Sequence, residues 1–434
     1  MQHANSLSPT SVLLAMWAEV KTCLGQGLSL PFALVSRYEH ERIIHVVGRL
    51  FTPVLGAPNN NRQCEVSMLR KTLPSTLWIS VLSAVVATGC GSGPQQEDTL
   101  TAAFLYLAQP GDLGWTYEHE EGRLALEDEL GDEVSTFTIT DVPDGEDSHD
   151  SVKQAIEDAV ERDADVIFTT SFGYMDPTYE MAEEYPGIIF EHCSGYKTRD
   201  NMATYFGRMY QPRYLSGLVA GSMTETDTIG YVAAFAIPEV IRGINAFTLG
   251  VRDANSDATV KVEWTETWYN PSKERAAAET LLDAGADIIT QHQDTPEPQQ
   301  AARQEDKLSI GYNSDMSRFV GDSVLTGPVW NWGEYYVETV KAVLDDTWST
   351  HEYWGDLKSG VVGLAPLSSE VPQAVATKVE QARDAVLGGE DVFCGPIANI
   401  SGDEQVANGD CMSDPDIWSM DWFVEGVDVT LPPE

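Results

Sequence analysis

The chain has 434 residues, of which 26 are Lys or Arg and 68 are Asp or Glu, so its formal net charge is −42. With 42% hydrophobic and 9% aromatic residues it can bury substantial cores, which excludes a wholly disordered chain. Nucleic acid and anionic membrane surfaces are both bound through Lys and Arg, so the acidic composition excludes them as partners of the folded part.

Residues 1–89 differ in charge from the rest of the chain. They hold seven basic and four acidic residues, a net charge of +3, whereas the other 345 residues carry −45. A secretory signal is predicted from Met68: a basic pair, an apolar run of eleven residues at 77–87, and small residues before Cys90. The run is too short to span a bilayer as a mature helix. Its ending resembles a bacterial lipobox, which implies that Cys90 carries lipid and becomes the new N-terminus.

The N-terminal region therefore divides into predicted segments of different kinds. We expect a signal peptide at 68–89 and a lipid anchor with a Gly/Ser/Gln tether at 90–98. Translation is expected to start at Met68, so residues 1–67 are interpreted as an upstream extension that is not normally made. The alternative is that they form a genuine cytoplasmic N-terminal segment. The alternative for the apolar run is an ordinary buried helix.

From residue 99 the apolar pattern predicts alternating strands and helices. The first run is expected as strand 100–108, helix 116–130, strand 134–140, a helix capped by Ser148, strand 165–170, helix 178–185 and strand 188–192. The second run is expected as helix 213–223, strand 228–232, helix 239–251, strand 261–267, helix 272–284, strand 287–291, helix 298–306 and strand 308–312. Helices at 332–344 and 371–387 and short strands follow.

Two successive βαβαβ runs predict an α/β protein with two doubly wound parallel-sheet lobes. We place the first lobe at 99–210 and the second at 211–324, and residues 325–434 are expected to contribute to both.

The cysteines of the mature chain suggest an exported protein. Cys394 and Cys411 flank a stretch rich in Gly, Asn and Asp, and could form a disulfide in an oxidising compartment. Cys193 is expected to be buried and inert. The spacing of Cys and His residues does not match a metal site, so no metal is predicted.

Ligands of doubly wound sheets bind beyond the carboxyl ends of the strands, so the candidate site lies in the loops that follow the strands. These loops supply aromatic, acidic and amide side chains, and none before the last helical region supplies Lys or Arg. The candidate ligand-binding residues are Asp112, Trp115, Thr116, Phe172, Tyr174, Asp176, Phe235, Trp268, His292, Asp294, Asn313, Asp315, Trp330 and Trp332.

This combination of side chains restricts the ligand. Aromatic faces suit a flat ring or a cation, and carboxylates and amides suit N–H donors. A site of this kind is a poor host for phosphate or carboxylate groups, whereas a neutral planar heterocycle with exocyclic amines fits it. The alternative is that many of these aromatic residues are simply part of the core.

Seven segments between residues 98 and 430 carry a resemblance to a known family. They are GDLGWT at 111–116, SFGYMD at 171–176, FEHCSGY at 190–196, IPEVIRGINAFTLG at 237–250, WTETWYNP at 264–271, and the loops at 291–294 and 311–316. The chain resembles the basic membrane lipoprotein family, the purine-binding substrate-binding proteins of ABC transporters.

The resemblance implies a type I periplasmic binding protein fold, with two lobes, a hinge of several crossings and a ligand between the lobes. It implies that Trp115 and Phe235 sandwich a purine and that Asp176 and Asp315 bind its ring and amino groups. Nucleoside-binding members carry a Lys toward the ribose where this chain has Val-Trp-Asn-Trp at 329–332. The resemblance therefore implies a free base, as in the adenine-binding members.

The expected function is that of a lipid-anchored, extracytoplasmic substrate-binding protein that delivers an adenine-like base to an ABC permease and its ATPase. The protein is expected to be a monomer without a cofactor and without enzymatic activity. Alternatives are binding of a purine nucleoside, binding of a quaternary amine in an aromatic cage, a ligand-sensing receptor domain, and a nucleoside hydrolase. A hydrolase would need a defined catalytic set, and the paired acids come without an evident nucleophile.

Overall fold

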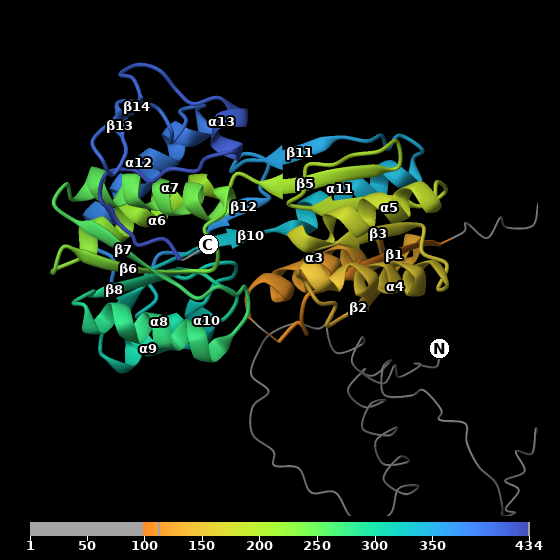
Figure 1. Cartoon of the computed structure of the whole chain (residues 1–434), viewed down its shortest axis with the longest axis horizontal. Helices are drawn as coiled ribbons and strands as arrows, with labels where there is room; N and C mark the ends of the chain where they lie inside the picture. Colours follow the sequence, from red (N-terminus) through yellow and green to blue (C-terminus); the bar gives the residue numbers. More distant parts are fainter. Residues whose placement is uncertain (1–98, 112, 433–434) are drawn as a thin grey trace, which may run out of the picture. The chain divides into compact units, whose positions relative to one another are not determined.

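The computed structural model describes residues 99–111 and 113–432 of the chain (Figure 1). The chain divides into two compact units, Met1–Gly89 and Cys90–Glu434, and every described residue belongs to the second unit. The predicted extension, signal peptide and lipidation site at Cys90 lie outside the described residues, as does Asp112. Among the described residues, no helix combines the length and apolarity needed to cross a membrane.

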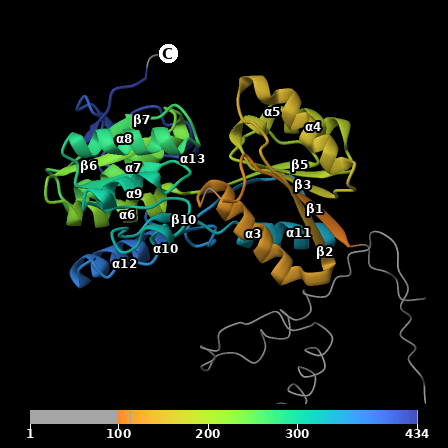
Figure 2. The same cartoon turned by 90° about the horizontal axis from the view of Figure 1, so that it is seen from below.

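The first lobe is built on a six-stranded parallel sheet with the strand order β11-β5-β4-β3-β1-β2. Helices α3 and α11 cover one face, and α4 and α5 cover the other (Figure 2). The strands are β1 (Leu100–Leu105), β2 (Val134–Ile139), β3 (Val166–Thr169), β4 (Ile189–Cys193), β5 (Met202–Gly207) and β11 (Glu352–Gly355). The helices are α3 (Trp115–Leu130), α4 (His149–Val160), α5 (Met175–Glu184) and α11 (Trp332–Leu344), and the 3-10 turns are η1 (Gly131–Glu133), η2 (Glu146–Ser148) and η3 (Phe172–Tyr174).

The sequence of β1 explains why helices cover both faces of this sheet. Successive side chains of a strand point to opposite faces. Ala102 and Phe104 therefore pack with α3 and α11, whereas Ala103 and Leu105 pack with α4 and α5, and all four are fully buried. A strand that is buried on both faces needs an apolar residue at every position, which accounts for the continuous apolar run.

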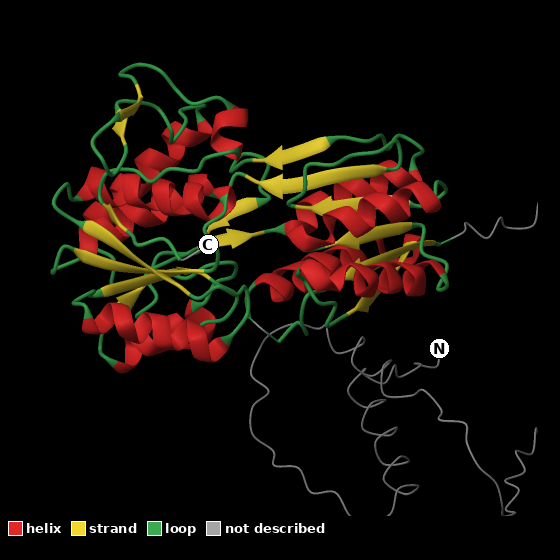
Figure 3. Cartoon of the chain, viewed as in Figure 1, coloured by secondary structure: helices red, strands yellow, loops and turns green. Residues whose placement is uncertain are grey.

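The second lobe is built on a five-stranded parallel sheet with the strand order β15-β7-β6-β8-β9. Helices α6 and α7 pack on one face and α8 and α9 on the other, so this sheet is also enclosed by two helical layers (Figure 3). The strands are β6 (Thr228–Ala233), β7 (Thr259–Trp264), β8 (Ile288–His292), β9 (Leu308–Ser309) and β15 (Val427–Asp428). The helices are α6 (Tyr210–Met223), α7 (Pro238–Ala254), α8 (Pro271–Asp283), α9 (Glu297–Gln304) and the short α10 (Ser317–Val320).

Glycines allow α6 and α7 to approach closely. A Cβ atom on Gly217 of α6 would lie 2.1 Å from the carbonyl oxygen of Phe247, and one on Gly250 of α7 would lie 2.1 Å from that of Tyr214. Any side chain at either position would push the helices apart, so their close packing depends on these two residues.

The C-terminal part of the chain links the two lobes. Helix α11 packs beside α3 and β11 forms an edge of the first sheet, whereas α12 packs beside α6 and β15 forms an edge of the second. The remaining strands form two antiparallel pairs, β10 with β12 and β13 with β14. The bounds of these elements are β10 (Pro328–Trp330), β12 (Val362–Leu364), α12 (Gln373–Leu387), β13 (Ile397–Ala398), β14 (Glu404–Val406) and α13 (Asp414–Trp418).

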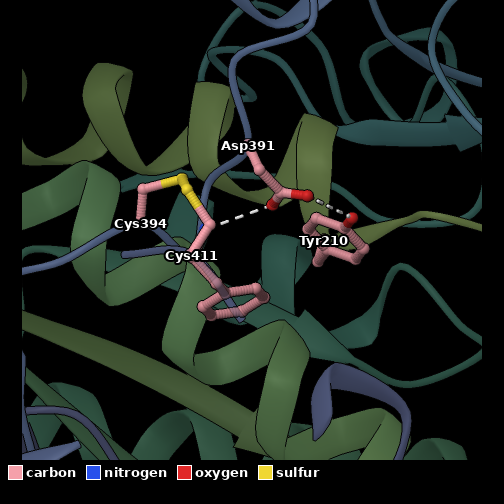
Figure 4. The surroundings of a disulfide bond; sticks show 5 residues. Tyr210, Asp391, Cys394 and Cys411 are labelled. Atoms are coloured by element: carbon pink, nitrogen blue, oxygen red, sulfur yellow. Dashed lines mark hydrogen bonds between the residues drawn. A yellow bond between two sulfur atoms is a disulfide. The ribbon is translucent and has the colours of Figure 1, made fainter. Parts of the chain in front are cut away.

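Cys394 and Cys411 form a disulfide, as their setting in the sequence suggested (Figure 4). The segment that carries Cys394 packs against α6 of the second lobe. The hydroxyl of Tyr210 donates to Oδ2 of Asp391 at 3.4 Å, and the rings of Tyr210 and Phe393 lie 5.3 Å apart between centroids. The disulfide therefore closes a loop that is fastened to the second lobe.

The expected fold class, two doubly wound parallel-sheet lobes, is confirmed, but some local expectations were wrong. Strands β5 and β11 were not predicted, although they complete one side of the first sheet. The helix expected at 178–185 begins at Met175. The hydroxyl of Ser148 donates to the carbonyl oxygen of Gly145 and does not cap α4.

Candidate functional site

A cavity lies at the carboxyl ends of the strands of both sheets, where ligands bind in doubly wound folds. It holds about 410 Å³ of space that no atom occupies, part of which is open to solvent. The first lobe contributes Leu107, Trp115, Ser171, Phe172 and Ser194, and the second contributes Glu239, Trp268, His292, Asp294 and Tyr312.

Three aromatic rings form much of the cavity wall. Trp115 is the first residue of α3, and its indole Nε1 donates to the carbonyl oxygen of Thr170 at 2.8 Å, which fixes the ring to the first lobe. Trp268 follows β7 in the second lobe, and Phe172 follows β3 with 41% of its surface exposed. Rings from both lobes thus face the same space, an arrangement suited to a flat ligand.

The serine hydroxyls of the first lobe already donate their protons within the protein. Ser171 donates to the carboxylate of Asp144, and Ser194 donates to the carbonyl oxygen of Cys193 at 2.7 Å. Each hydroxyl oxygen keeps a lone pair with which it can accept from a ligand. This side of the cavity therefore favours a ligand that donates hydrogen bonds.

His292 is the polar centre of the second lobe's wall. Its Nε2 lies 3.4 Å from Oε1 of Glu239 and 3.2 Å from the hydroxyl of Tyr312. Burial lowers the pKa of His292 to about 4, so the imidazole is neutral at pH 7, and burial raises the pKa of the Tyr312 phenol. The Glu239 carboxylate thus lies against a neutral imidazole.

The loop that carries Asp294 is anchored from two directions. Glu274, in the first turn of α8, accepts from the backbone N–H of Thr295 at 3.1 Å and from its hydroxyl at 2.5 Å. Asn313 donates to the carbonyl oxygen of Gln293 at 3.2 Å and to Oδ1 of Asp294 at 3.4 Å. The position of the Asp294 carboxylate is thus fixed before a ligand arrives.

Backbone geometry around the cavity is unusual. A Cβ atom on Gly114 would lie 1.8 Å from the carbonyl oxygen of Asp294, so only glycine allows these two loops to meet. Leu113, Ser194 and Asn313 all have left-handed backbones, with φ of 63°, 64° and 66°. Such conformations cost about 1–3 kcal/mol each and concentrate at binding sites, where the surrounding structure maintains them.

Of the residues predicted from the sequence, Trp115, Phe172, Trp268, His292 and Asp294 line the cavity. Trp330 and Trp332 lie behind it and are fully buried. Their rings stack at 4.3 Å between centroids, and each meets the ring of Trp115 edge-on at 5.7 Å. We infer that they hold Trp115 in its orientation.

The other predicted residues have partners away from the cavity. Tyr174 is buried in the core and donates to the carbonyl oxygen of Val142 at 2.5 Å, and Thr116 is buried within α3. Asp176 pairs with Lys197 at 2.5 Å on the surface.

Two further predicted residues act on neighbours of the cavity. The ring of Phe235 packs edge-on against Trp268, with 5.1 Å between centroids, and so supports a residue that lines the cavity. Asp315 accepts hydrogen bonds from the backbone N–H and the hydroxyl of Ser317, which fixes its own loop.

Sequence reasoning missed five residues that line the cavity: Leu107, Ser171, Ser194, Glu239 and Tyr312. Applying the carboxyl-end rule further would have found Ser194 and Glu239, whereas Leu107 and Tyr312 fell inside the strands expected at 100–108 and 308–312. The loop after β4, which holds Ser194, was not inspected for ligand contacts, and the loop after β6 was considered only as far as Pro238, one residue short of Glu239.

The charged residues that line the cavity are acidic. Among the described residues, no Lys or Arg lines the cavity, whereas Glu239 and Asp294 both do. In the same part of the chain, no cluster of three or more His, Cys, Asp or Glu residues is placed to hold a metal ion. The arrangement suits a planar ligand that donates hydrogen bonds from its edges.

Comparison with known proteins points in the same direction. Residues 99–387 match the family described as ABC transporter substrate-binding protein PnrA-like (Bmp). A purine-binding protein of Brucella abortus is 40% identical over 353 residues, which cover 81% of this chain and 99% of that protein. A protein of Haloferax volcanii named as an ABC transporter glucose-binding protein is 39% identical over 348 residues, which cover 80% of this chain and 85% of that protein.

Among solved structures, an ABC transporter solute-binding protein from Aeropyrum pernix matches with a TM-score of 0.59 and 17% identity. The match covers 70% of this chain and 94% of that one. At this identity the likeness shows the fold alone, and it agrees with a type I periplasmic binding protein fold.

Proposed function

The chain belongs to the Bmp family of PnrA-like ABC transporter substrate-binding proteins, and from this premise we propose that it binds a free, adenine-like purine base between its two lobes. Proteins of this class work outside the cytoplasm and pass a small molecule to a permease that is driven by an ATPase. The proposed role is binding and delivery, without chemical change of the ligand.

One observation carries the proposal: rings from both lobes and hydrogen-bond acceptors line the same small cavity. Trp115 and Trp268 can cover the faces of a heterocycle, and stacking on an aromatic side chain contributes about 1–3 kcal/mol per base. Glu239 and Asp294 can accept from ring and amino N–H groups. A carboxylate left buried without a partner costs several kcal/mol, so these two residues favour ligands with N–H donors.

The relatives from Brucella abortus and Haloferax volcanii bear names that point to different ligands, a purine and glucose. The hydroxyls of a hexose can donate to Glu239 and Asp294, but their oxygens also need donors, and the protons of Ser171 and Ser194 are already used inside the protein. A purine requires polar partners only at its edges and apolar cover on its faces. The cavity of this chain therefore supports the purine.

Two other classes of ligand, nucleosides and quaternary amines, could also contact the side chains of the site. A nucleoside would need polar partners for its ribose, and the rings of Trp115, Phe172 and Trp268 take up much of the cavity wall. A quaternary amine could sit against the same rings through cation–π attraction. Both are included in the test.

Calorimetric titration of the purified protein would test the proposal. The protein is first unfolded in denaturant without reductant, which keeps the disulfide, and refolded to remove any carried ligand. It is then titrated with adenine, guanine, adenosine, glucose and betaine. Adenine should bind most tightly. Preferential binding of glucose or betaine, or no binding of any purine, would contradict the proposed function.

We further propose that Cys90 is lipidated after removal of the signal peptide at 68–89 and anchors the protein, as a monomer, to the membrane. The basic pair, apolar run and lipobox-like ending support this. In the native host, replacing Cys90 with Ser should move the protein from the membrane fraction to the soluble fraction. An unchanged distribution between the fractions would contradict the lipid anchor.

A further inference from the structure

We propose that Glu239 makes the protein selective for a free base over an N9-substituted one, its carboxylate accepting a ring N–H that a nucleoside lacks. The inference rests on the proposed function and adds a specificity-determining residue to it. Glu239 lies in the first turn of α7, directly after β6, and lines the cavity with its side chain 18% exposed.

Glu239 lies beside charged groups of the second lobe that do not reach the cavity. It stands in the first turn of α7, where the positive end of the helix macrodipole attracts a negative group. Arg242 is buried one turn further along α7, and Arg213 of α6 is buried with its guanidinium carbon 3.7 Å from the ring centroid of Tyr312. Neither arginine lines the cavity, whereas Glu239 does.

His292 and Tyr312 separate Arg213 from the cavity and orient Glu239. Nη1 of Arg213 donates to the carbonyl oxygen of Gln291 at 2.6 Å, which holds the end of β8 in place. The adjacent His292 reaches Oε1 of Glu239 through Nε2 at 3.4 Å. An imidazole that donates from Nε2 uses one acceptor site of the Glu239 carboxylate and leaves the others for a ligand.

An ionised carboxylate can only accept, so the ligand must supply the proton. Glu239 belongs to α7 and Asp294 to the loop after β8, so the two carboxylates reach the cavity from different elements. A free purine base carries donors on two edges, an exocyclic amine on the six-membered ring and an N–H on the imidazole ring. Substitution at N9 removes the second donor. Two separately placed acceptors thus match a free base better than a nucleoside.

The experiment compares adenine with 9-methyladenine, which keeps the amine and both ring faces but lacks the N9 proton. The wild-type protein should bind adenine at least tenfold more tightly than 9-methyladenine. Glu239→Gln, which keeps the shape of the side chain, should weaken adenine binding at least tenfold and 9-methyladenine binding less than threefold. Glu239→Met, which removes the acceptor and keeps the length, should act in the same way if Glu239→Gln fails to fold.

Glu279→Gln is the matched control, because Glu279 lies on α8 of the same lobe with 58% of its side chain exposed, and it should leave both affinities unchanged. If Glu239→Gln weakened the binding of adenine and of 9-methyladenine equally, Glu239 would act by holding His292 in place and not by accepting the N9 proton. This result would overturn the inference. Unchanged affinity of Glu239→Gln for both ligands would overturn the inference as well. Absence of purine binding to the wild-type protein would instead remove the proposed function on which the inference rests.

Discussion

The hydroxyl of Ser314 donates a hydrogen bond to the carbonyl oxygen of Leu113 at 2.6 Å. Ser314 follows β9 of the second lobe and Leu113 follows β1 of the first, so the bond joins the lobes beside the cavity. Leu113 has a left-handed backbone, with φ of 63°, which is unfavourable for a residue with a branched side chain. The bond holds the Leu113 carbonyl in this conformation and can exist only while the lobes are together.

Replacing Ser314 with Ala should therefore speed ligand release. One hydrogen bond contributes about 0.5–1.5 kcal/mol, so we expect a three- to tenfold increase in the dissociation rate, measured by stopped-flow fluorescence. Ser317→Ala serves as the control, because Ser317 donates to Asp315 within its own loop. An unchanged dissociation rate in Ser314→Ala would show that the bond contributes nothing to closure.

The aromatic residues of the cavity should differ in their contributions to binding. Trp115→Ala removes a stacking surface and should weaken adenine binding by about 1–3 kcal/mol in calorimetry. Phe235→Ala should weaken it less, because Phe235 contacts Trp268 and does not line the cavity. Equal losses for the two variants would support the sandwich of Trp115 and Phe235 that the family resemblance implies.

Tyr174 should affect stability and leave binding unchanged. Tyr174→Phe removes the hydrogen bond to the carbonyl oxygen of Val142 and leaves that buried acceptor without its partner. The free energy of unfolding, measured in urea, should fall by about 1–3 kcal/mol, while the affinity for adenine stays within twofold. If Tyr174→Phe lost much of its affinity for adenine while its free energy of unfolding stayed the same, Tyr174 would belong to the binding site.

Acid should destabilise the protein through its buried histidines. Burial lowers the pKa of His292 to about 4 and that of His192 to about 3, whereas a histidine in the unfolded chain titrates near 6.5. Below about pH 6.5 the unfolded chain binds protons that the folded chain does not. The contribution of these histidines to the free energy of unfolding should therefore fall as the pH drops from about 6.5 to 4, by on the order of 3 kcal/mol for His292 alone. Glu274 acts in the opposite direction, because burial raises its pKa to about 7.

The His292→Asn variant isolates this effect. Its free energy of unfolding should depend less on pH between about 6.5 and 4 than that of the wild-type protein, in urea titrations at fixed pH values. His149→Asn, at a half-exposed position on α4, should leave the dependence unchanged. Identical pH dependence in the wild-type protein and His292→Asn would be evidence against a neutral, buried His292.

The disulfide should stabilise the C-terminal segment. The bridge between Cys394 and Cys411 spans a sequence separation of 17 residues, and closing a loop of that size contributes about 3 kcal/mol in the chain-entropy description. Replacing both cysteines with Ser should lower the midpoint of thermal unfolding and increase proteolysis within 394–411. Because neither cysteine lines the cavity, adenine affinity should be retained. A shift in affinity without a shift in the unfolding midpoint would contradict this assignment.

The sequence allowed much of the fold to be predicted because both sheets are parallel and buried on two faces. Runs such as residues 100–105 are apolar except at Thr101, and helices at the expected spacing alternate with them. Strands β5 and β11 escaped prediction for a physical reason. They pair with each other across a long stretch of chain, and the four residues of β11 carry little periodic signal of their own.

The candidate site was harder to predict than the fold. The rule of carboxyl ends correctly located the loops, and five predicted residues line the cavity. It could not distinguish a ring that faces the cavity, such as Trp115, from one directly behind it, such as Trp332, because both follow strand ends. That difference depends on tertiary packing, which a single sequence does not display.

The position of β11 has a consequence for how the protein is made. Strand β5 lies next to β11 at one side of the first sheet, and every strand of the second sheet except β15 lies between them in the chain. Until residues 352–355 have been synthesised, β5 has an unpaired edge that invites aggregation or capture by a chaperone. The first lobe to leave the ribosome is thus among the last parts to be finished.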